Sequence, residues 1–275
     1  MKTVVITGST RGIGRGLAEA FLAQGCKVLV AGRGTAAVES VVAALEARYP
    51  GKVAGAACDI TQAAQLDNLW RVACAKFTRV DVWINNAGMS IARGPLHKAK
   101  AADIEAIVAT NLTGALLANR IVIAEMLKQG GGQVWNMEGF GSNGATQPGM
   151  AAYGATKRGI NYLIKALQKE LKGTPVQVCT LSPGIVVTDL LIGDYDLKSK
   201  EWVKAKKIFN ILGDTVETVT PWLAAQVLAS NKPGATVAWL TTGKAFGRFM
   251  SAGFKKRDLF GTRVGFSPPS CTKRK

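Results

Sequence analysis

The chain has 275 residues, of which 48% are hydrophobic and 31 are glycine, a composition that excludes disordered and fibrous classes of protein. Its formal net charge of +17 calls for a negatively charged partner, but no nucleic-acid motif accompanies the basic residues, so no nucleic acid is expected. The single histidine, His97, excludes a multi-histidine metal site, and no apolar run approaches the roughly 18 residues of a membrane span.

The first predicted elements are a strand over residues 4–6, a glycine-rich turn and an apolar helix. Because the strand begins almost at Met1, no signal or transit peptide is expected. A glycine-rich turn between a buried strand and a helix brings backbone N–H groups up to a pyrophosphate. The spacing is G-x-x-x-G-x-G, so the strand–turn–helix context carries the prediction. The residues expected to bind a dinucleotide here are Gly8, Ser9, Thr10, Arg11, Gly12, Ile13 and Gly14.

The second strand, residues 27–31, ends in Gly32 and Arg33. In sites that prefer NAD, an acidic residue near this point binds the ribose 2′-hydroxyl. Here the sequence offers Arg33 and Arg11 and no acid, which favours the 2′-phosphate of NADP. The alternative is that both arginines are merely exposed.

Further strands are predicted at residues 53–58, 80–84, 133–137, 176–181 and 236–240, with a long helix over residues 108–127. Asp59, after the third strand, either meets adenine or caps the helix that begins near Gln62. Strands that alternate with helices predict an α/β fold, a single Rossmann-type doubly wound domain with a mainly parallel seven-stranded sheet. Residues 1–243 would form this domain, with the substrate segment at about 189–222.

Tyr153 and Lys157 are one turn apart on a helix predicted from about Met150. A free phenol titrates near pH ~10, and an ammonium one turn away favours the phenolate. Such a pair can pass a proton to a carbonyl oxygen while a hydride arrives from elsewhere. Alone, a Tyr and a Lys at this spacing are equally well a buried ring and a solvated charge.

Residues 244–275 form a predicted basic extension that carries nine Lys or Arg and one acid. Basic residues interleaved with aromatics favour a phosphate-rich or anionic lipid surface, and the alternative is a solvated terminus. The phenylalanines of this extension are Phe246, Phe249, Phe254, Phe260 and Phe266. The five cysteines are scattered, and four of them are expected to be core residues in a reducing compartment.

Taken together, the motifs make the chain similar to the short-chain dehydrogenase/reductase superfamily from Met1 to about Leu240. The resemblance implies that Tyr153 is the general acid/base, that Lys157 assists it and binds the nicotinamide ribose, and that Asn111 holds a water. It also implies that Thr188 and the backbone at Ile185 meet the carboxamide, and that residues 85–88 support the sheet. The cofactor residues that it implies after the strand ends are Asp59, Ile60, Asn86, Ala87, Gly88, Pro183, Gly184, Ile185 and Thr188.

The family's catalytic serine is expected about 13 residues before the tyrosine, and the sequence departs from the pattern there. Residues 136–142 read Asn-Met-Glu-Gly-Phe-Gly-Ser, so that Ser142 comes only 11 residues before Tyr153. We expect the loop to bring Ser142 to the substrate carbonyl. The alternatives are that Glu138 or backbone groups substitute, or that Ser142 is purely structural.

This departure, together with residues 151–158, 181–191, 209–212 and 240–245, resembles the chlorophyll(ide) b reductases of plants and algae. The resemblance implies that NADPH reduces the 7-formyl group of chlorophyll b or chlorophyllide b to 7-hydroxymethyl. It implies a chloroplast location, stromal or peripheral on the thylakoid, with the basic extension docking on that membrane or on the antenna complex, and a homo-oligomer. The apolar residues expected against the macrocycle, or in core packing, are Leu190, Leu191, Ile192, Trp202, Ile208, Phe209 and Leu212.

Two other functions fit the same motifs. Another NADPH-dependent carbonyl reductase, with a hydrophobic aldehyde or ketone as substrate, would share every cofactor residue. A non-catalytic NADP-binding scaffold would explain the missing serine, but Tyr153, Lys157 and Asn111 argue against it.

Overall fold

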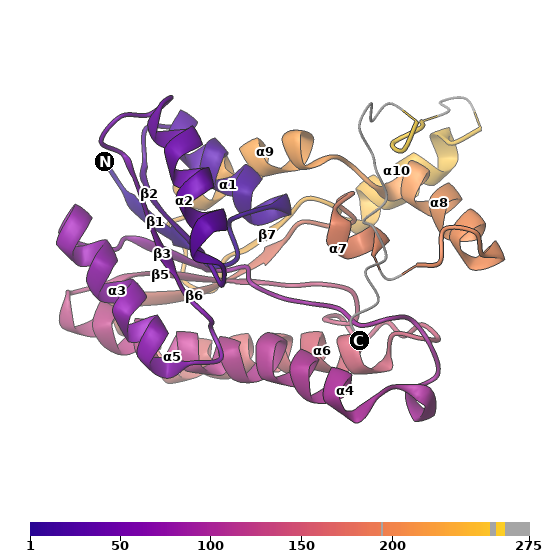
Figure 1. Ribbon diagram of the computed structural model, residues 1–275, viewed down its shortest axis with the longest axis horizontal. Helices are drawn as coiled ribbons and strands as arrows, with labels where there is room; N and C mark the ends of the chain where they lie inside the picture. Colours follow the sequence, from indigo (N-terminus) through magenta and orange to yellow (C-terminus); the bar gives the residue numbers. More distant parts are fainter. Residues whose placement is uncertain (194, 254–256, 262–275) are drawn as a thin grey trace.

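Seven parallel strands form one sheet in the order β3-β2-β1-β4-β5-β6-β7 (Figure 1). The computed structural model describes residues 1–193, 195–253 and 257–261. The predicted seven-stranded sheet of an α/β fold is therefore confirmed, and every described strand pair is parallel. The strands are β1 (Thr3–Ile6), β2 (Lys27–Gly32), β3 (Val53–Ala57), β4 (Val82–Asn85), β5 (Gly132–Met137), β6 (Val176–Ser182) and β7 (Thr236–Ala238).

Helices cover both faces of the sheet, as the connections between parallel strands require. One apolar layer joins α1, α2 and α9 to the sheet, and the other joins α3, α5 and α6 to it (Figure 1). The helices are α1 (Gly12–Ala23), α2 (Thr35–Glu46), α3 (Ala63–Phe77), α4 (Ala101–Val108), α5 (Gly114–Lys128), α6 (Ala151–Glu170), α7 (Asp189–Ile192), α8 (Lys200–Leu212), α9 (Val216–Ala229) and α10 (Thr242–Ser251), with short turns η1 (Leu96–Lys98) and η2 (Ala109–Thr113).

The helix predicted over residues 108–127 is longer than expected, because α4, η2 and α5 run on as one helix from Ala101 to Lys128. Its centre, η2, is a π-turn that contains Asn111. By length and composition it is the one helix of the described chain apolar enough to cross a membrane, yet half of its most apolar window is buried. Its α5 portion packs in the core layer with α3, so we interpret it as a core helix.

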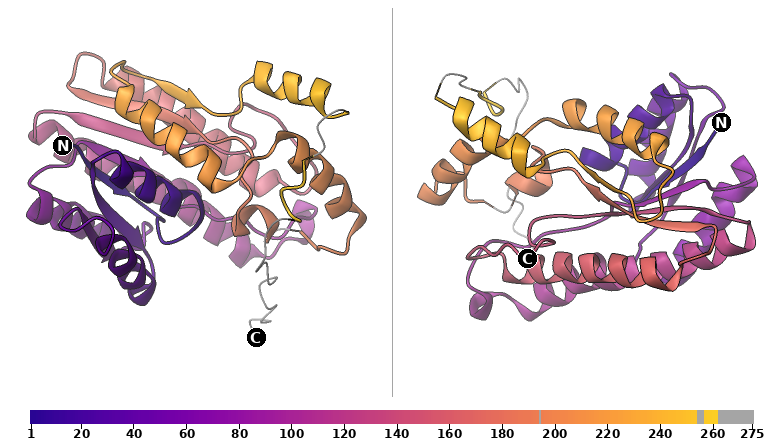
Figure 2. Two further views of the ribbon diagram at one scale, coloured as in Figure 1. Left: turned by 90° about the horizontal axis from the view of Figure 1, so that it is seen from above. Right: turned by 180° about the vertical axis from the view of Figure 1, so that it is seen from behind.

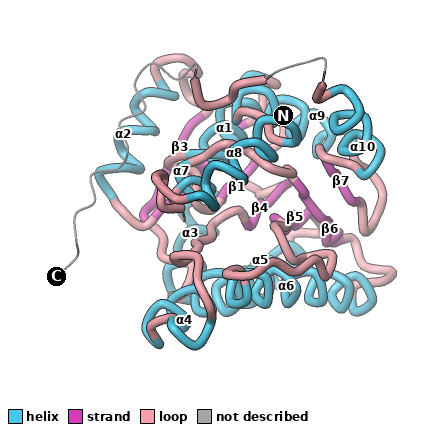
Figure 3. Tube along the Cα trace, turned by 90° about the vertical axis from the view of Figure 1, so that its right-hand side faces the viewer, coloured by secondary structure: helices cyan, strands magenta, loops and turns pink. Residues whose placement is uncertain are grey.

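Helices α7, α8 and α10 lie beyond the carboxyl ends of the strands, at one end of the molecule (Figure 2). A view onto this end shows α7 and α8 in front of the sheet (Figure 3). The described part of the predicted basic extension is not detached from the fold, since α10 packs against α8. Phe254, Phe266 and six of the nine basic residues of the extension lie outside the described residues.

Candidate active site

The cofactor residues expected from the sequence surround a cleft of about 430 Å³ at the carboxyl ends of the strands. The cleft is lined by the turn after β1, the end of β2, the segment after β3 and the loop after β4. The predicted residues on its wall are Gly8, Thr10, Arg11, Gly12, Ile13, Gly14, Arg33, Asp59, Ile60, Asn86, Ala87, Gly88 and Thr188.

Glycine is required in the turn after β1 because the loop after β4 lies against it. A Cβ on Gly8 would stand 2.8 Å from the Cα of Ala87, and the φ of Gly8 is +65°. The side chain of Asn86 holds this approach by donating to the carbonyls of Thr7 (2.9 Å) and Gly8 (3.0 Å). No side chain at Gly8 covers the backbone of this turn, which we call the glycine floor. A pyrophosphate can therefore approach the backbone and the N-terminus of α1.

The structure corrects the prediction that Ser9 contacts the cofactor. Ser9 is fully buried, and its hydroxyl donates to the carbonyl of Ile6 at 2.7 Å. Its backbone N–H donates to the carbonyl of Ala31 at 2.8 Å, and its hydroxyl accepts from the N–H of Ala31. With both groups used to join β1 to β2, Ser9 has a structural role.

Arg11 and Arg33 are both exposed and both line the cleft, as the preference for a 2′-phosphate requires. Asp59 also lines it, and its carboxylate accepts from the N–H (2.9 Å) and the hydroxyl (2.8 Å) of Thr61. The residue that precedes α3 is Gln62, and no side chain caps that helix. The capping role weighed for Asp59 is therefore wrong, and Asp59 shapes the turn ahead of α3 instead.

Tyr153 and Lys157 lie on the face of α6 that also carries the buried Ile160 and Ile164, and this shared face draws both polar residues inward. Lys157 is 7% exposed and its Nζ donates to the carbonyl of Met137 at 3.1 Å. The Nζ lies 5.8 Å from the ring centre of Tyr153. Burial lowers the pKa of Lys157 to about 8, although the charge of Glu138 opposes this.

Gly139, rather than Ser142, lies against the hydroxyl of Tyr153. A Cβ on Gly139 would stand 2.5 Å from that hydroxyl and 3.1 Å from Cε of Lys157. Ser142 is 3% exposed, and its hydroxyl accepts from the N–H of Gly139 at 3.1 Å. The expectation that the loop brings Ser142 to the substrate is therefore not met: the serine braces the loop from behind the glycine.

Asn111 holds the loop after β4 through its side chain. Its Oδ1 accepts from the N–H of Met89 and its Nδ2 donates to the carbonyl of Met89, both at 2.8 Å. The Nδ2 also donates to Thr156 on α6 at 3.2 Å. Beside it, a cavity of about 10 Å³ lies between Asn111 and Lys157. This is about the space that one water needs, and the surrounding polar groups suit one.

The segment after β6 lies partly in the cleft and partly in the fold. Thr188 lines the cleft and caps α7 by accepting from the N–H of Leu191 at 3.4 Å. Gly184 has a φ of +72° and packs against Leu240. The carbonyl of Ile185 accepts from the N–H of Asp214 at 2.9 Å, and neither Pro183, Gly184 nor Ile185 lines the cleft.

A second cavity, of about 370 Å³, adjoins Tyr153. It is lined by the loop between Ser90 and Lys100, by Asp103 and by residues 149–153 at the start of α6. The cavity offers space for a substrate beside the Tyr153 side chain. Ser90 lines this cavity, and the residue before it, Met89, lines the cofactor cleft.

The aromatic residues of the substrate segment pack on one another. The ring of Trp202 lies 5.4 Å from that of Tyr195, 6.3 Å from that of Phe209 and 5.3 Å from that of Phe260. Phe260 belongs to the predicted basic extension, so the extension completes this cluster. Of the two alternatives weighed for Trp202 and Phe209, packing is therefore the one observed, whereas Leu190 lines the cofactor cleft.

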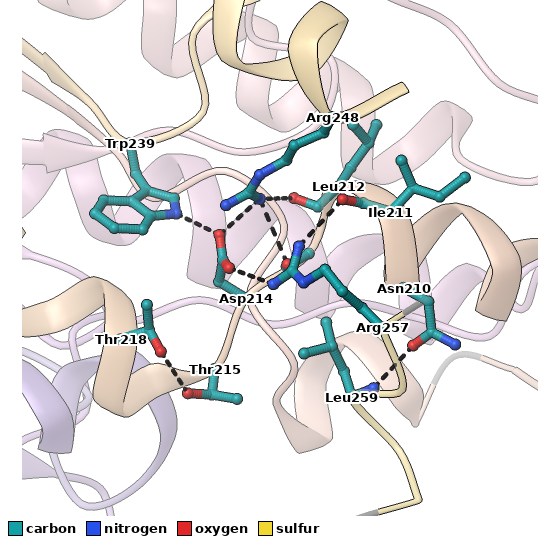
Figure 4. A network of polar contacts seen from close by, with 11 residues as sticks. Asn210, Ile211, Leu212, Asp214, Thr215, Thr218, Trp239, Arg248, Arg257 and Leu259 are labelled. Atoms are coloured by element: carbon teal, nitrogen blue, oxygen red, sulfur yellow. Dashed lines mark hydrogen bonds and ion pairs between the residues drawn. The ribbon is translucent and has the colours of Figure 1, made fainter. Parts of the chain in front are cut away.

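One buried carboxylate, Asp214, ties this end of the molecule together (Figure 4). Its oxygens meet Arg248 of α10 at 2.7 Å and Arg257 at 2.6 Å, and accept from the indole of Trp239 at 2.6 Å. Arg248 also donates to the carbonyl of Leu212 at 2.8 Å. Burial by itself would raise the pKa of Asp214, but the hydrogen bonds from Arg248, Trp239 and Arg257 bring it below its ordinary value.

Sequence reasoning missed several residues of the two cavities. Arg93 and the lysines of the same loop line the second cavity, and Met89, Thr110 and Asp189 line the cofactor cleft. The order of the motifs gave no signal for Arg93, because it lies in a loop without regular spacing. Thr110 could have been found from its position beside Asn111.

A short chain dehydrogenase family matches residues 2–196 of the chain. The chloroplastic chlorophyll(ide) b reductase NOL of Arabidopsis thaliana is 36% identical over 257 residues, which cover 90% of this chain and 72% of that protein. The probable chlorophyll(ide) b reductase NYC1 of the same plant is 35% identical over 257 residues, covering 87% of this chain and 51% of that protein. The chain thus spans about half the length of NYC1.

Among solved structures, the closed form of a serine dehydrogenase complexed with NADP+ is similar to this chain. The TM-score is 0.73 at 26% identity, with 88% of this chain and 95% of that chain covered. The similarity therefore extends over most of both chains.

Proposed function

The chain belongs to the short chain dehydrogenase family, and from that premise we propose that it reduces the 7-formyl group of chlorophyll b or chlorophyllide b to 7-hydroxymethyl. The observation that carries the proposal is the extent of the similarity to the chlorophyll(ide) b reductase NOL. That similarity covers 90% of the chain, more than the family match over residues 2–196, and so extends past residue 196 into the segment that follows the family match.

The cofactor is NADPH, which supplies the hydride when bound. The glycine floor at Gly8 and the N-terminus of α1 would hold its pyrophosphate. Arg11 and Arg33 would hold the 2′-phosphate, since two guanidiniums and no carboxylate stand at the end of β2. Thr188, which lines the same cleft, would meet the carboxamide.

In the proposed reaction, Tyr153 gives its hydroxyl proton to the oxygen of the formyl group. The positive charge of Lys157, buried beside it, favours loss of that proton and would also hold the nicotinamide ribose. A water beside Asn111, in the small cavity that reaches Lys157, would resupply the proton. General acid catalysis of this kind contributes typically 10²- to 10⁴-fold in rate.

Gly139 gives the proposal its substrate preference. A side chain at this position would stand over the hydroxyl of Tyr153, whereas glycine leaves that space to a broad, flat substrate. Ser142 acts through the loop: by accepting from the N–H of Gly139 it keeps the backbone clear of the site. Ser142 is therefore proposed as a positioning residue.

We also propose that the chain docks on the thylakoid surface or its antenna complex within the chloroplast, as a homo-oligomer. Phe246, Phe249 and Met250 share one face of α10 and are 68%, 48% and 67% exposed. Tyr162 on α6 is 76% exposed and would suit contact with a second copy of the chain. Arg248 and Arg257 are engaged by Asp214, so docking would use the other basic residues.

The test is incubation of the purified protein with NADPH and chlorophyllide b, with the product identified by chromatography and mass. We expect the 7-hydroxymethyl product from the wild-type protein. Tyr153→Phe should lower turnover roughly 1,000-fold while NADPH still binds. An untouched pigment in the presence of bound NADPH would overturn the substrate, and unchanged turnover by the variant would remove Tyr153 from the mechanism.

A further inference from the structure

Arg93 lines the second cavity, and two nitrogens of its guanidinium have no hydrogen-bond partner among the described residues. It stacks on the ring of Tyr195, with 4.2 Å between Cζ and the ring centre. Its Nε and Nη1 are buried and have no hydrogen-bond partner among the residues that the structure describes. Buried donors are almost always satisfied, and an unsatisfied charged one is costly, so this pair of nitrogens calls for an acceptor from outside the chain.

The rest of the cavity does not supply that acceptor. Its charged lining residues besides Arg93 are Lys98, Lys100 and Asp103, which gives three cations against one carboxylate. No hydrogen bond or ion pair joins Asp103 to Arg93 within the described ranges. Much of the remaining wall is apolar and includes Ile91 and Met150. An apolar cavity with one oriented cation is the usual form of a site that recognises an apolar body with a single acidic group.

We propose that Arg93 binds a carboxylate of the substrate and is the specificity-determining residue of this cavity. The identity of the carboxylate rests on the proposed function: the phytol-free pigment carries a free propionate, whereas in chlorophyll b the same group is an ester. A guanidinium binds a carboxylate through charge-assisted, paired hydrogen bonds, and an ester has no charge to offer. The chain would thus prefer chlorophyllide b over chlorophyll b.

The test compares acids with their methyl esters, which differ in charge but hardly in size. The pairs are chlorophyllide b with its methyl ester, and 4-formylbenzoate with methyl 4-formylbenzoate, each followed with NADPH. Wild-type protein should prefer the acid in each pair. Arg93→Gln should raise the KM of the acid roughly 10- to 100-fold, with kcat and the KM of the ester unchanged.

Two further variants separate binding from structure. Arg93→Lys keeps the charge and the position over Tyr195, and should keep part of the preference for the acid. Lys98→Gln removes an exposed cation from the same cavity and should change the KM of the acid less than about threefold, because an exposed charge is screened. Melting temperature and NADPH affinity are measured for each variant.

The outcomes divide cleanly. Equal losses on acid and ester in Arg93→Gln would make Arg93 a structural residue and overturn the proposal, as would a wild-type protein that does not distinguish the members of either pair. If neither pigment is reduced but the benzoate pair shows a preference that depends on Arg93, the carboxylate site stands and the pigment assignment fails.

Discussion

The cofactor cleft and the end of the molecule that carries α8 and α10 are built in different ways. Around the cofactor cleft, positions follow from backbone contacts between neighbouring strand ends, such as Gly8 against Ala87, with Asn86 as the tie. At the end of the molecule that carries α8 and α10, the chain is held by side chains from distant segments that meet at Asp214. The first end depends on the absence of side chains, and the second depends on one buried charge. Substitutions should therefore affect ligand affinity at the first and folding stability at the second.

The largest expected effect tests the cofactor end. Arg33→Asp removes a guanidinium and adds a negative charge where the 2′-phosphate would lie, so the Kd for NADPH should rise roughly 100- to 1,000-fold, with NADH little changed. Fluorescence titration with both nucleotides measures this. Arg71→Asp makes the same change of charge on the exposed side of α3 and serves as the control. Equal losses for NADPH and NADH would mean that Arg33 does not meet the 2′-phosphate.

Next, Asp214→Asn tests the other end. Removing a charge from a buried network leaves Arg248 and Arg257 without a counter-ion, and the free energy of unfolding should fall by about 3 kcal/mol while NADPH affinity stays near wild type. Urea unfolding measures the loss. Glu19→Gln breaks the exposed pair with Arg15 on α1 and should cost less than about 0.5 kcal/mol. Similar losses of unfolding free energy in the two variants would contradict the claim that the buried Asp214 network stabilises the fold more than an exposed ion pair does.

The same carboxylate predicts a response to acid. Because its pKa in the folded protein lies below the ordinary 3.8, the stability that it contributes is present above that value and is lost as pH falls through the lower, folded pKa. The difference in stability between the wild-type protein and Asp214→Asn should therefore shrink below about pH 4.

An effect of similar size is expected beside Tyr153. Lys157→Met should abolish turnover yet stabilise the cofactor-free protein by about 3 kcal/mol at pH 7, because the buried ammonium has a pKa near 8 instead of 10.5. Between these values the unfolded chain binds more protons, so wild-type stability should rise with pH and approach that of the variant. A stability difference that does not change from pH 7 to pH 10 would contradict this.

The smallest effect concerns the opening over Tyr153. Gly139→Ala places a Cβ 2.5 Å from the Tyr153 hydroxyl and should lower kcat for the pigment roughly tenfold, while NADPH binds as before. Gly154→Ala is the matched control on α6, because its Cβ would meet only the Cα of Gly141, at 4.0 Å. Steady-state kinetics measure both. Equal kcat values for the two variants would show that the space left by Gly139 over the Tyr153 hydroxyl is not needed for the reaction.

The fold was predictable because each strand is a short apolar run followed by a turn signal. Every predicted strand overlaps an observed one, and the glycine-rich turn led to the cofactor cleft. The helix with Asn111 was predicted too short, because a π-turn lets two helical segments run on as one. Ser9 was misassigned because position in a glycine-rich turn does not show whether a side chain faces the ligand or the strands.

The network at Asp214 was less predictable because its contacts join residues far apart in the chain. Asp214 lies 34 residues before Arg248 and 43 before Arg257, and no local pattern signals either pairing. Tyr153 and Lys157 could be paired from helical spacing, but the identity of the residue opposite Tyr153 depends on the path of the loop after β5. Counting back about 13 residues from the tyrosine met no serine, so the nearby Ser142 was expected at the site, whereas the loop brings Gly139 there.

The interlock at Asp214 also governs how this chain can be recombined with its relatives. A hybrid joined between Asp214 and Arg257 would combine a carboxylate from one parent with cations from the other, and would fold well only if both parents carried the same network. The Asp214 N–H donates to the carbonyl of Ile185, so a junction in β6, before Ile185, takes the whole network from one parent. Residues 185–261 thus form a natural block for exchange, whereas the second cavity, with Arg93, would come from the other parent.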